Sequence, residues 1–477
     1  MNLIDYRASR IAAFAVGAFI LLAATLLSQS LWDAIARATL LAVVAFAMMF
    51  APKRLGVLSW SAGVPAFYGL FFLLLPLPQT LYGNNPLESD HGTANALLIA
   101  ASGLFAFFVG AMTVHLTKKP PSTFAIAKVH PLDILEKPTA IAIAITVASI
   151  ALLWSYFFGY FGLIATTGQD VAGGAGLISA ITFFLPIAHV VSWNQFLLKR
   201  DRHFLLLGTI STVVMLAFGL LANSKGQLVL PFFLIALCAW GASAKFPLRL
   251  LVLSIFLYVF VAFPLVTASR IALQSGFADS RSELAQLTFD YLVSGQWMTD
   301  ATDFSARESF DRGLLAYFAR IVQEAGTSVP LMHGATLVQG FEVFVPRILF
   351  PDKPDMNIGN WTAQAFGLVD SGDDVTNLSP TFIGELYMNF DFGGVLLGML
   401  LLGGLAVVVD RYLIVDRGSW TMPIMVLAIG WQESLIGHTI LPFIKNALLL
   451  IVLLLLVSYC TKLARLAASP SARGADR

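Results

Sequence analysis

The sequence predicts an all-α polytopic membrane protein. Hydrophobic residues make up 58% of its 477 residues, charged residues only 12%, and long apolar runs recur along the chain. This profile is typical of a chain that crosses a membrane many times. An α-helix needs ~20 mostly apolar residues to span a bilayer. About twelve runs approach that length: 11–29, 36–51, 56–76, 94–116, 138–158, 176–197, 203–222, 227–243, 248–268, 388–409, 419–437 and 439–461.

The distribution of basic residues predicts the orientation. The first apolar run is long for a signal peptide and lacks a clear cleavage site, so we expect it to be a retained helix. Lysine and arginine accumulate in cytoplasmic loops. With a cytoplasmic N-terminus and twelve spans, 19 of the 29 basic residues fall in cytoplasmic segments. Both termini are therefore expected in the cytoplasm.

One external connection, from Ser269 to Pro380, is far longer than the others. It carries 14 of the 28 acidic residues and includes amphipathic stretches such as GLLAYFARIVQ. Loops longer than ~15 residues are commonly functional or disordered. We expect a small, mostly helical external domain, with an exposed linker as the alternative. The predicted organisation is helices 1–9 in residues 1–268, the loop domain in 269–380, and helices 10–12 with a cytoplasmic tail in 381–477.

Several charged residues lie at the predicted outer ends of the spans. Asp33 and Arg37 are four positions apart and predict an ion pair across one helical turn. Four external cations are exceptions to the rule that basic residues stay inside, and cations there suit an anionic ligand such as a phosphate. Arg270 could instead extend to the lipid headgroups. The four are Lys225, Arg270, Arg347 and Lys353.

The tenth predicted span begins with a polar stripe. Thr381, Glu385 and Asn389 recur every four residues and so share one helix face. Glu385 has no cation in register on its own helix, and ionisable residues in spans are functional candidates. Small residues that follow the stripe predict close helix packing, which would hold the polar end in place. They are Gly393, Gly394, Gly398, Gly403 and Gly404.

Several classes of function have no support in the sequence. It contains no phosphate-binding loop of the nucleotide-hydrolase type and no dinucleotide-binding fingerprint. No residues have the spacing of zinc ligands. Cys238 and Cys460 both fall in predicted spans and indicate neither a disulfide nor a metal. We therefore expect no cofactor, no metal and no nucleic-acid partner.

Two segments resemble a known family. HGATLVQGFEVFVPRILFPDKP, followed by SPTFIGELYMNFDFGGVLLGMLLLGG, is similar to the O-antigen polymerase (Wzy-type) and related oligosaccharide repeat-unit polymerases of bacteria. Members often have a Pro-Arg, an aromatic-Pro-x-Lys-Pro segment and a Gly-Glu-x-Tyr-x-Asn-Phe segment that leads into a glycine-rich helix. The strong match covers Gly334 to Gly404. Asp391 departs from the pattern, because a glycine is expected after Asn-Phe.

The resemblance implies a lipid-linked glycosyltransferase of GT-C-like architecture in the bacterial inner membrane, with a periplasmic active site. It would join undecaprenyl-diphosphate-linked oligosaccharides, in contact with membrane lipid and with a chain-length regulator as a further candidate partner. An O-antigen ligase or peptidoglycan-type polymerase, and a flippase of lipid-linked sugars, remain alternatives. The residues expected in the site are Glu385, Arg270 and Arg347 for catalysis, Lys225, Arg270, Arg347 and Lys353 for the diphosphates, and Tyr387, Asn389 and His333 for sugar binding or support.

Overall fold

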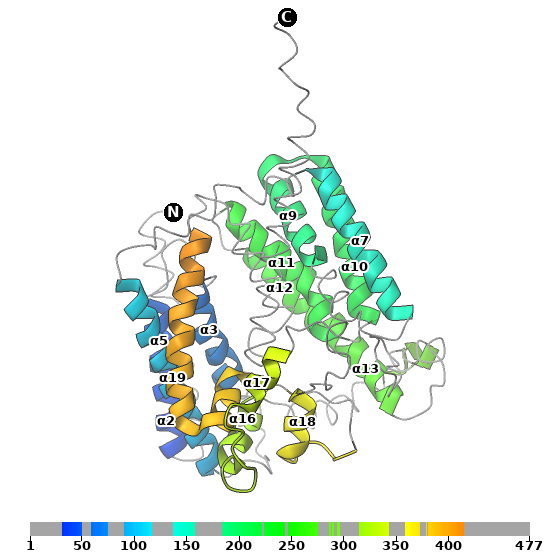
Figure 1. The fold of residues 1–477 in the computed structure, drawn as a ribbon. Helices are drawn as coiled ribbons and strands as arrows, with labels where there is room; N and C mark the ends of the chain where they lie inside the picture. Colours follow the sequence, from blue (N-terminus) through cyan, green and yellow to red (C-terminus); the bar gives the residue numbers. More distant parts are fainter. Residues whose placement is uncertain are drawn as a thin grey trace, which may run out of the picture. The chain divides into compact units, whose positions relative to one another are not determined.

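The computed structural model is almost entirely helical (Figure 1). It describes residues 31–49, 59–74, 90–116, 137–157, 184–221, 224–243, 247–274, 314–342, 358–372 and 380–414, with short pieces at 286–287, 289–290, 293–295 and 378. Within these residues one isolated β-bridge joins Ala325 and Val329.

The chain divides into two compact units, each made of segments distant in sequence. The first comprises Met1–Lys118, Thr288–Pro423 and Gly430–Phe443, and the second Lys119–Leu287, Ile424–Ile429 and Ile444–Arg477. Unit 1 contains α2 (Leu31–Met49), α3 (Trp60–Gly69), η2 (Leu70–Leu74), α5 (Asp90–Leu116), α16 (Leu314–Glu324), α17 (Ala335–Glu342), α18 (Ile358–Ala365) and α19 (Thr381–Ile414). Unit 2 contains α7 (Pro138–Phe157), α9 (Phe184–Lys199), α10 (Arg202–Leu221), α11 (Lys225–Ser243), α12 (Leu248–Leu257), η3 (Tyr258–Ala262) and α13 (Phe263–Gln274).

The described helices include four that are long and apolar enough to cross a membrane. They are Gly92–Leu116, Arg202–Leu220, Leu248–Val266 and Thr381–Val408. Every predicted span from 36–51 to 388–409 coincides with helix in the described residues, whereas 11–29, 419–437 and 439–461 lie outside them. Leu397, Leu401 and Leu405 form an exposed apolar stripe on α19. A surface of this kind suits lipid, and the chain is membrane-embedded.

Two glycines allow α5 and α19 to pack backbone against backbone. A methyl group at Gly110 would overlap the carbonyl oxygen of Leu400, and one at Gly403 would overlap the carbonyl oxygen of Phe107. Gly103 faces Val395 near the start of the contact and Gly404 faces Val114 near its end, so the two helices run in the same direction. Close approach through small residues is how helices pack in lipid. The predicted packing role is confirmed at Gly403 and Gly404.

Glycine packing does not extend to the whole predicted set. A methyl group at Gly393 would meet nothing within 4 Å. Gly394 and Gly398 face Phe390 and Leu386, which belong to α19 itself rather than to a neighbouring helix. The cause is a sharp turn in α19, described below.

A buried aspartate fixes the start of α3 to the end of α19. Asp410 Oδ1 accepts a hydrogen bond from the Trp60 backbone N–H at 2.7 Å, and its Oδ2 accepts from the Ser61 N–H at 3.0 Å and the Ser61 hydroxyl at 2.6 Å. The first N–H groups of a helix have no partner within the helix. The Asp410 carboxylate supplies a partner for two of them. Burial raises the pKa of this carboxyl above the ordinary value.

A second buried pair lies within α2. Arg37 Nε donates to Asp33 Oδ2 at 2.7 Å, across one helical turn, and the Arg37 side chain is only 3% exposed. The predicted pairing of these two residues is confirmed. A pair so enclosed is costly to break, because either partner alone would be a buried charge.

The helices of unit 2 enclose a polar cluster of their own. His189 on α9 is fully buried, and its ring nitrogens lie 3.0 Å from Ser211 Oγ on α10 and 3.1 Å from the Pro231 carbonyl oxygen on α11. Trp193 Nε1 donates to the Gly208 carbonyl oxygen at 3.1 Å. Buried polar groups usually have such partners, and these bonds hold α9, α10 and α11 together.

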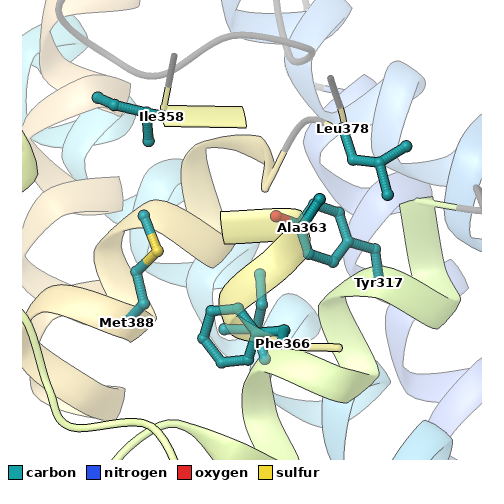
Figure 2. Close-up of a cluster of buried hydrophobic side chains, with 7 residues drawn as sticks. Tyr317, Ile358, Ala363, Phe366, Leu378 and Met388 are labelled. Atoms are coloured by element: carbon teal, nitrogen blue, oxygen red, sulfur yellow. The ribbon is translucent and has the colours of Figure 1, made fainter. Parts of the chain in front are cut away.

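A hydrophobic core joins α16 and α18, which lie within the long predicted loop, to the first part of α19, which follows it. Figure 2 shows side chains from α16, α18 and the first part of α19 meeting there, with Leu378 beside them. The amphipathic stretch predicted from GLLAYFARIVQ forms α16, with its apolar face buried. Tyr317 and Phe318 are 1% and 0% exposed and are core residues. The core comprises Tyr317, Ile321, Ile358, Ala363, Phe366, Leu378 and Met388.

Candidate functional site

The site lies where α19 turns sharply. Phe390 has φ −137° and ψ 17°, and Asp391 has φ 58° and ψ −159°, so the helix is interrupted at these two residues. Leu386 and Gly398 are in contact, although twelve helical positions would separate them by ~18 Å in a straight helix. The segment Thr381–Asn389 therefore folds back along the start of the apolar segment that follows Asp391.

This folded-back segment is enclosed by protein. Every residue from Thr381 to Asn389 is buried except Tyr387, which is partly buried. Gly384 packs on Ile321 and Phe318 of α16, and the Ile383 backbone N–H donates to the Tyr68 hydroxyl at 3.3 Å. Because lipid offers no hydrogen bonds, polar groups beside a spanning helix must find protein partners. The surrounding helices provide that enclosure.

Three polar side chains meet within the enclosure. Glu385 is 0% exposed, and its Oε1 accepts a hydrogen bond from the Thr336 hydroxyl at 3.0 Å. Asn389 is also 0% exposed, and its Nδ2 lies 2.7 Å from the Thr336 oxygen and 2.7 Å from the Glu385 carbonyl oxygen. The Thr336 hydroxyl, on α17, thus accepts a hydrogen bond from Asn389 and donates one to Glu385. We call Glu385, Asn389 and Thr336 the polar triad.

The polar triad also fixes a turn in the preceding segment. Gly334 donates its N–H to Asn389 Oδ1 at 2.9 Å, and the N–H groups of Met332 and His333 donate to the carbonyl oxygens of Met388 and Asn389. The last carbonyls of a helix lack partners within it, and this turn satisfies two of them. Gly334 has φ +87°, and the Phe390 ring lies where its Cβ would be, so only glycine fits there.

The predicted site residues of unit 1 have different surroundings. His333 is exposed and has φ 46°, so the turn holds it at the surface beside the end of the polar stripe. The Tyr387 ring contacts Phe318 edge to face, with centroids 6.4 Å apart, and packs against the α16–α18 core. Tyr387 therefore supports the fold on one side. The prediction that Glu385 and Asn389 share a helix face is confirmed.

The predicted cations lie elsewhere in the chain. Lys225 begins α11 and Arg270 lies on α13, both in unit 2. Arg347 and Lys353 lie outside the described residues. The proximity of these four cations to the polar triad stays a prediction.

Sequence reasoning missed Thr336 and gave no role to Asp391. Thr336 is separated from Glu385 by 49 positions and has no distinctive neighbours, so no periodic pattern connects them. The resemblance could have drawn attention to Asp391, because a glycine is expected at this position. The backbone of Asp391 does adopt a conformation that suits glycine.

Among the described residues, no group of three or more His, Cys, Asp or Glu side chains could hold a metal ion. Comparison of the chain with protein-family models, with curated proteins and with solved structures finds no match. The structure thus contains an enclosed polar triad that connects the first part of α19 with α17 and the turn that precedes α17.

Proposed function

We propose that the chain is a polymerase that joins undecaprenyl-diphosphate-linked oligosaccharide repeat units at the periplasmic face of the bacterial inner membrane. It would have about twelve spans, a GT-C-like architecture, cytoplasmic termini and an external domain between spans 9 and 10. A chain-length regulator is a candidate partner.

One observation carries the proposal. The two segments that resemble repeat-unit polymerases are separated by 24 residues, and residues of both form the polar triad and the turn that it fixes. Buried polar groups in a membrane protein are costly and mark functional positions.

The reaction needs few chemical groups. The donor is a glycan on a lipid diphosphate, and the acceptor is a sugar hydroxyl on another lipid-linked unit. Cations must neutralise the diphosphate as it leaves, and a polar group must orient the hydroxyl. We assign Lys225, Arg270, Arg347 and Lys353 to the diphosphates.

Glu385 suits an orienting role better than direct contact with substrate. Its carboxylate is enclosed and holds Thr336, which is connected through Asn389 to the turn that carries His333. Loss of the carboxylate would therefore disturb the position of the exposed groups near the polar triad. Catalytic geometry of this kind depends on such supporting bonds.

Substitutions in cells that make their polysaccharide with this chain test the proposal. Glu385→Gln keeps the size of the side chain but removes its charge, and Arg347→Ala removes a proposed diphosphate ligand. Both are expected to shorten the polymer and lower its yield, whereas Asp370→Asn, in an exposed turn, is expected to have no effect. Unchanged polymer in both Glu385→Gln and Arg347→Ala would contradict the assignment.

A further inference from the structure

The turn between α9 and α10 in unit 2 carries a compact group of basic residues. Between positions 199 and 203 every residue except Asp201 is basic, and the basic residues are all exposed. With the histidine neutral, the turn has a net charge of +2. We call Lys199, Arg200, Arg202 and His203 the cationic turn.

The acidic residue of this turn is bonded to its own helix. Asp201 Oδ1 accepts a hydrogen bond from the His203 backbone N–H at 2.9 Å and lies 3.0 Å from Nδ1 of the same residue. Such a carboxylate satisfies an N–H that has no partner within the helix. Asp201 is the single acidic residue from 184 to 221, a stretch that the structure describes without a gap, and no ion pair joins it to Arg200 or Arg202. Two guanidinium groups, which match phosphate oxygens well, therefore keep donors for an external anion.

Aromatic rings support two of the cations from below. Arg200 Cζ lies 5.8 Å from the centroid of the Phe196 ring, and Lys199 Nζ lies 5.9 Å from the centroid of the Phe204 ring. A cation over a ring face is attracted to it. The N–H donors of a guanidinium lie in its own plane, so a ring that contacts its face leaves them open to a ligand.

The apolar surface beside the cationic turn places it at the level of the lipid headgroups. Arg202 begins α10, which is long and apolar enough to cross a membrane. Leu206, Ile210 and Val213 are exposed, and their spacing from Arg202 puts all four residues on one face of α10. An exposed apolar stripe on a spanning helix faces hydrocarbon, and a long basic side chain at its end extends to the headgroups.

We propose that the cationic turn binds the phosphate of an anionic phospholipid, with Arg200 and Arg202 as its ligands. This binding is independent of the proposed polymerase reaction. The predicted orientation puts the turn at the cytoplasmic surface, where anionic lipids attract basic segments next to spanning helices. The apolar stripe on α10 favours a lipid over a soluble phosphate, because the acyl chains of the lipid can cover that stripe.

The chain offers a matched control for the arginine at the start of α10. Arg249 is also exposed, lies in the first turn of α12 in the same unit, and is predicted on the same side of the membrane. Its two neighbours in sequence are leucines, so it has no adjacent cation. Arg202→Gln and Arg249→Gln thus remove the same charge from similar positions, but only the first alters the cationic turn.

The test uses purified full-length protein in a zwitterionic detergent, with bound lipid counted by native mass spectrometry. Phosphatidylglycerol is compared with phosphatidylcholine of the same acyl chains, and inorganic phosphate is added as a competitor. Thermal unfolding midpoints in phosphatidylcholine show whether each variant is folded. If Arg200→Gln combined with Arg202→Gln unfolds early, Arg202→Gln alone serves for the comparison.

The wild type is expected to bind phosphatidylglycerol more tightly than phosphatidylcholine. Arg202→Gln should weaken phosphatidylglycerol binding ~5-fold and the double variant at least ~10-fold, whereas Arg249→Gln should change it less than ~2-fold. Arg200→Lys combined with Arg202→Lys should keep most of the affinity, because the charges remain. Equal losses in Arg202→Gln and Arg249→Gln overturn the proposal, since any surface cation would then serve. Equal wild-type affinity for the two lipids, or displacement of the lipid by inorganic phosphate, also overturns it.

Discussion

The close packing of α5 on α19 can be tested by adding one methyl group at two glycines of the same helix. In Gly403→Ala, the new methyl would overlap the Phe107 carbonyl oxygen, which is backbone and cannot move aside as a side chain would. Overpacking costs ~1–3 kcal/mol, and the rigid obstacle favours the upper end. The better helix propensity of alanine returns about 1 kcal/mol. The expected net loss of stability is about 2 kcal/mol.

The control is the identical substitution just after the kink. In Gly393→Ala the methyl would meet nothing within 4 Å, so alanine should stabilise the helix by about 0.5–1 kcal/mol. The measurement is thermal unfolding of both variants in the same detergent. The midpoint should fall for Gly403→Ala and rise or stay level for Gly393→Ala. Equal shifts of the same sign would refute the described packing of α19.

Three further substitutions test other parts of the structure, each by unfolding in detergent. Thr336→Val removes the hydroxyl shared within the polar triad and is expected to cost ~1–3 kcal/mol, whereas Thr336→Ser should cost less; equal losses would contradict the hydrogen bonds described. Asp33→Ala is expected to cost ~3–5 kcal/mol because it leaves Arg37 buried without this partner, and Asp33→Ala combined with Arg37→Met should recover most of the loss; no recovery would contradict it. Burial raises the pKa of Asp410, so the folded protein binds that proton more tightly than the unfolded chain. Its contribution to stability is therefore present at low pH and is lost as the pH rises above ~4. Asp410→Asn should remove this part of the pH dependence, and an unchanged slope would contradict the burial of the charge.

Hydropathy could predict the helices because burial in lipid demands long apolar runs. Of the glycines predicted to pack against a neighbouring helix, Gly403 and Gly404 do face α5, because small residues in a spanning helix commonly mark the face where another helix approaches closely. Gly110 of α5 was not predicted. The turn in α19 could not be predicted in this way. The stretch 388–409 is apolar on both sides of Asp391, so its hydropathy is that of one continuous span.

The candidate site was predictable only in part. The spacing of Glu385 and Asn389 placed both on one face, but their common partner Thr336 comes from a distant segment. Whether a given side chain is exposed or buried was harder to predict from the sequence. Glu385 could be singled out as an ionisable group in a span, yet only the fold shows that it is enclosed while Asp391 is open. Sequence position does not reveal which of two nearby carboxylates is exposed.

The most direct test of the account is whether the purified protein, given only a short lipid-diphosphate-linked repeat unit, makes polymer. Products are read by mass, with and without EDTA. A repeat-unit polymerase of this kind is expected to give a ladder of products spaced by one repeat unit, unchanged by EDTA. Transfer only to a lipid A-type acceptor would indicate a ligase instead. No covalent product, together with movement of the lipid-linked sugar between the leaflets of liposomes, would contradict the assignment as an enzyme.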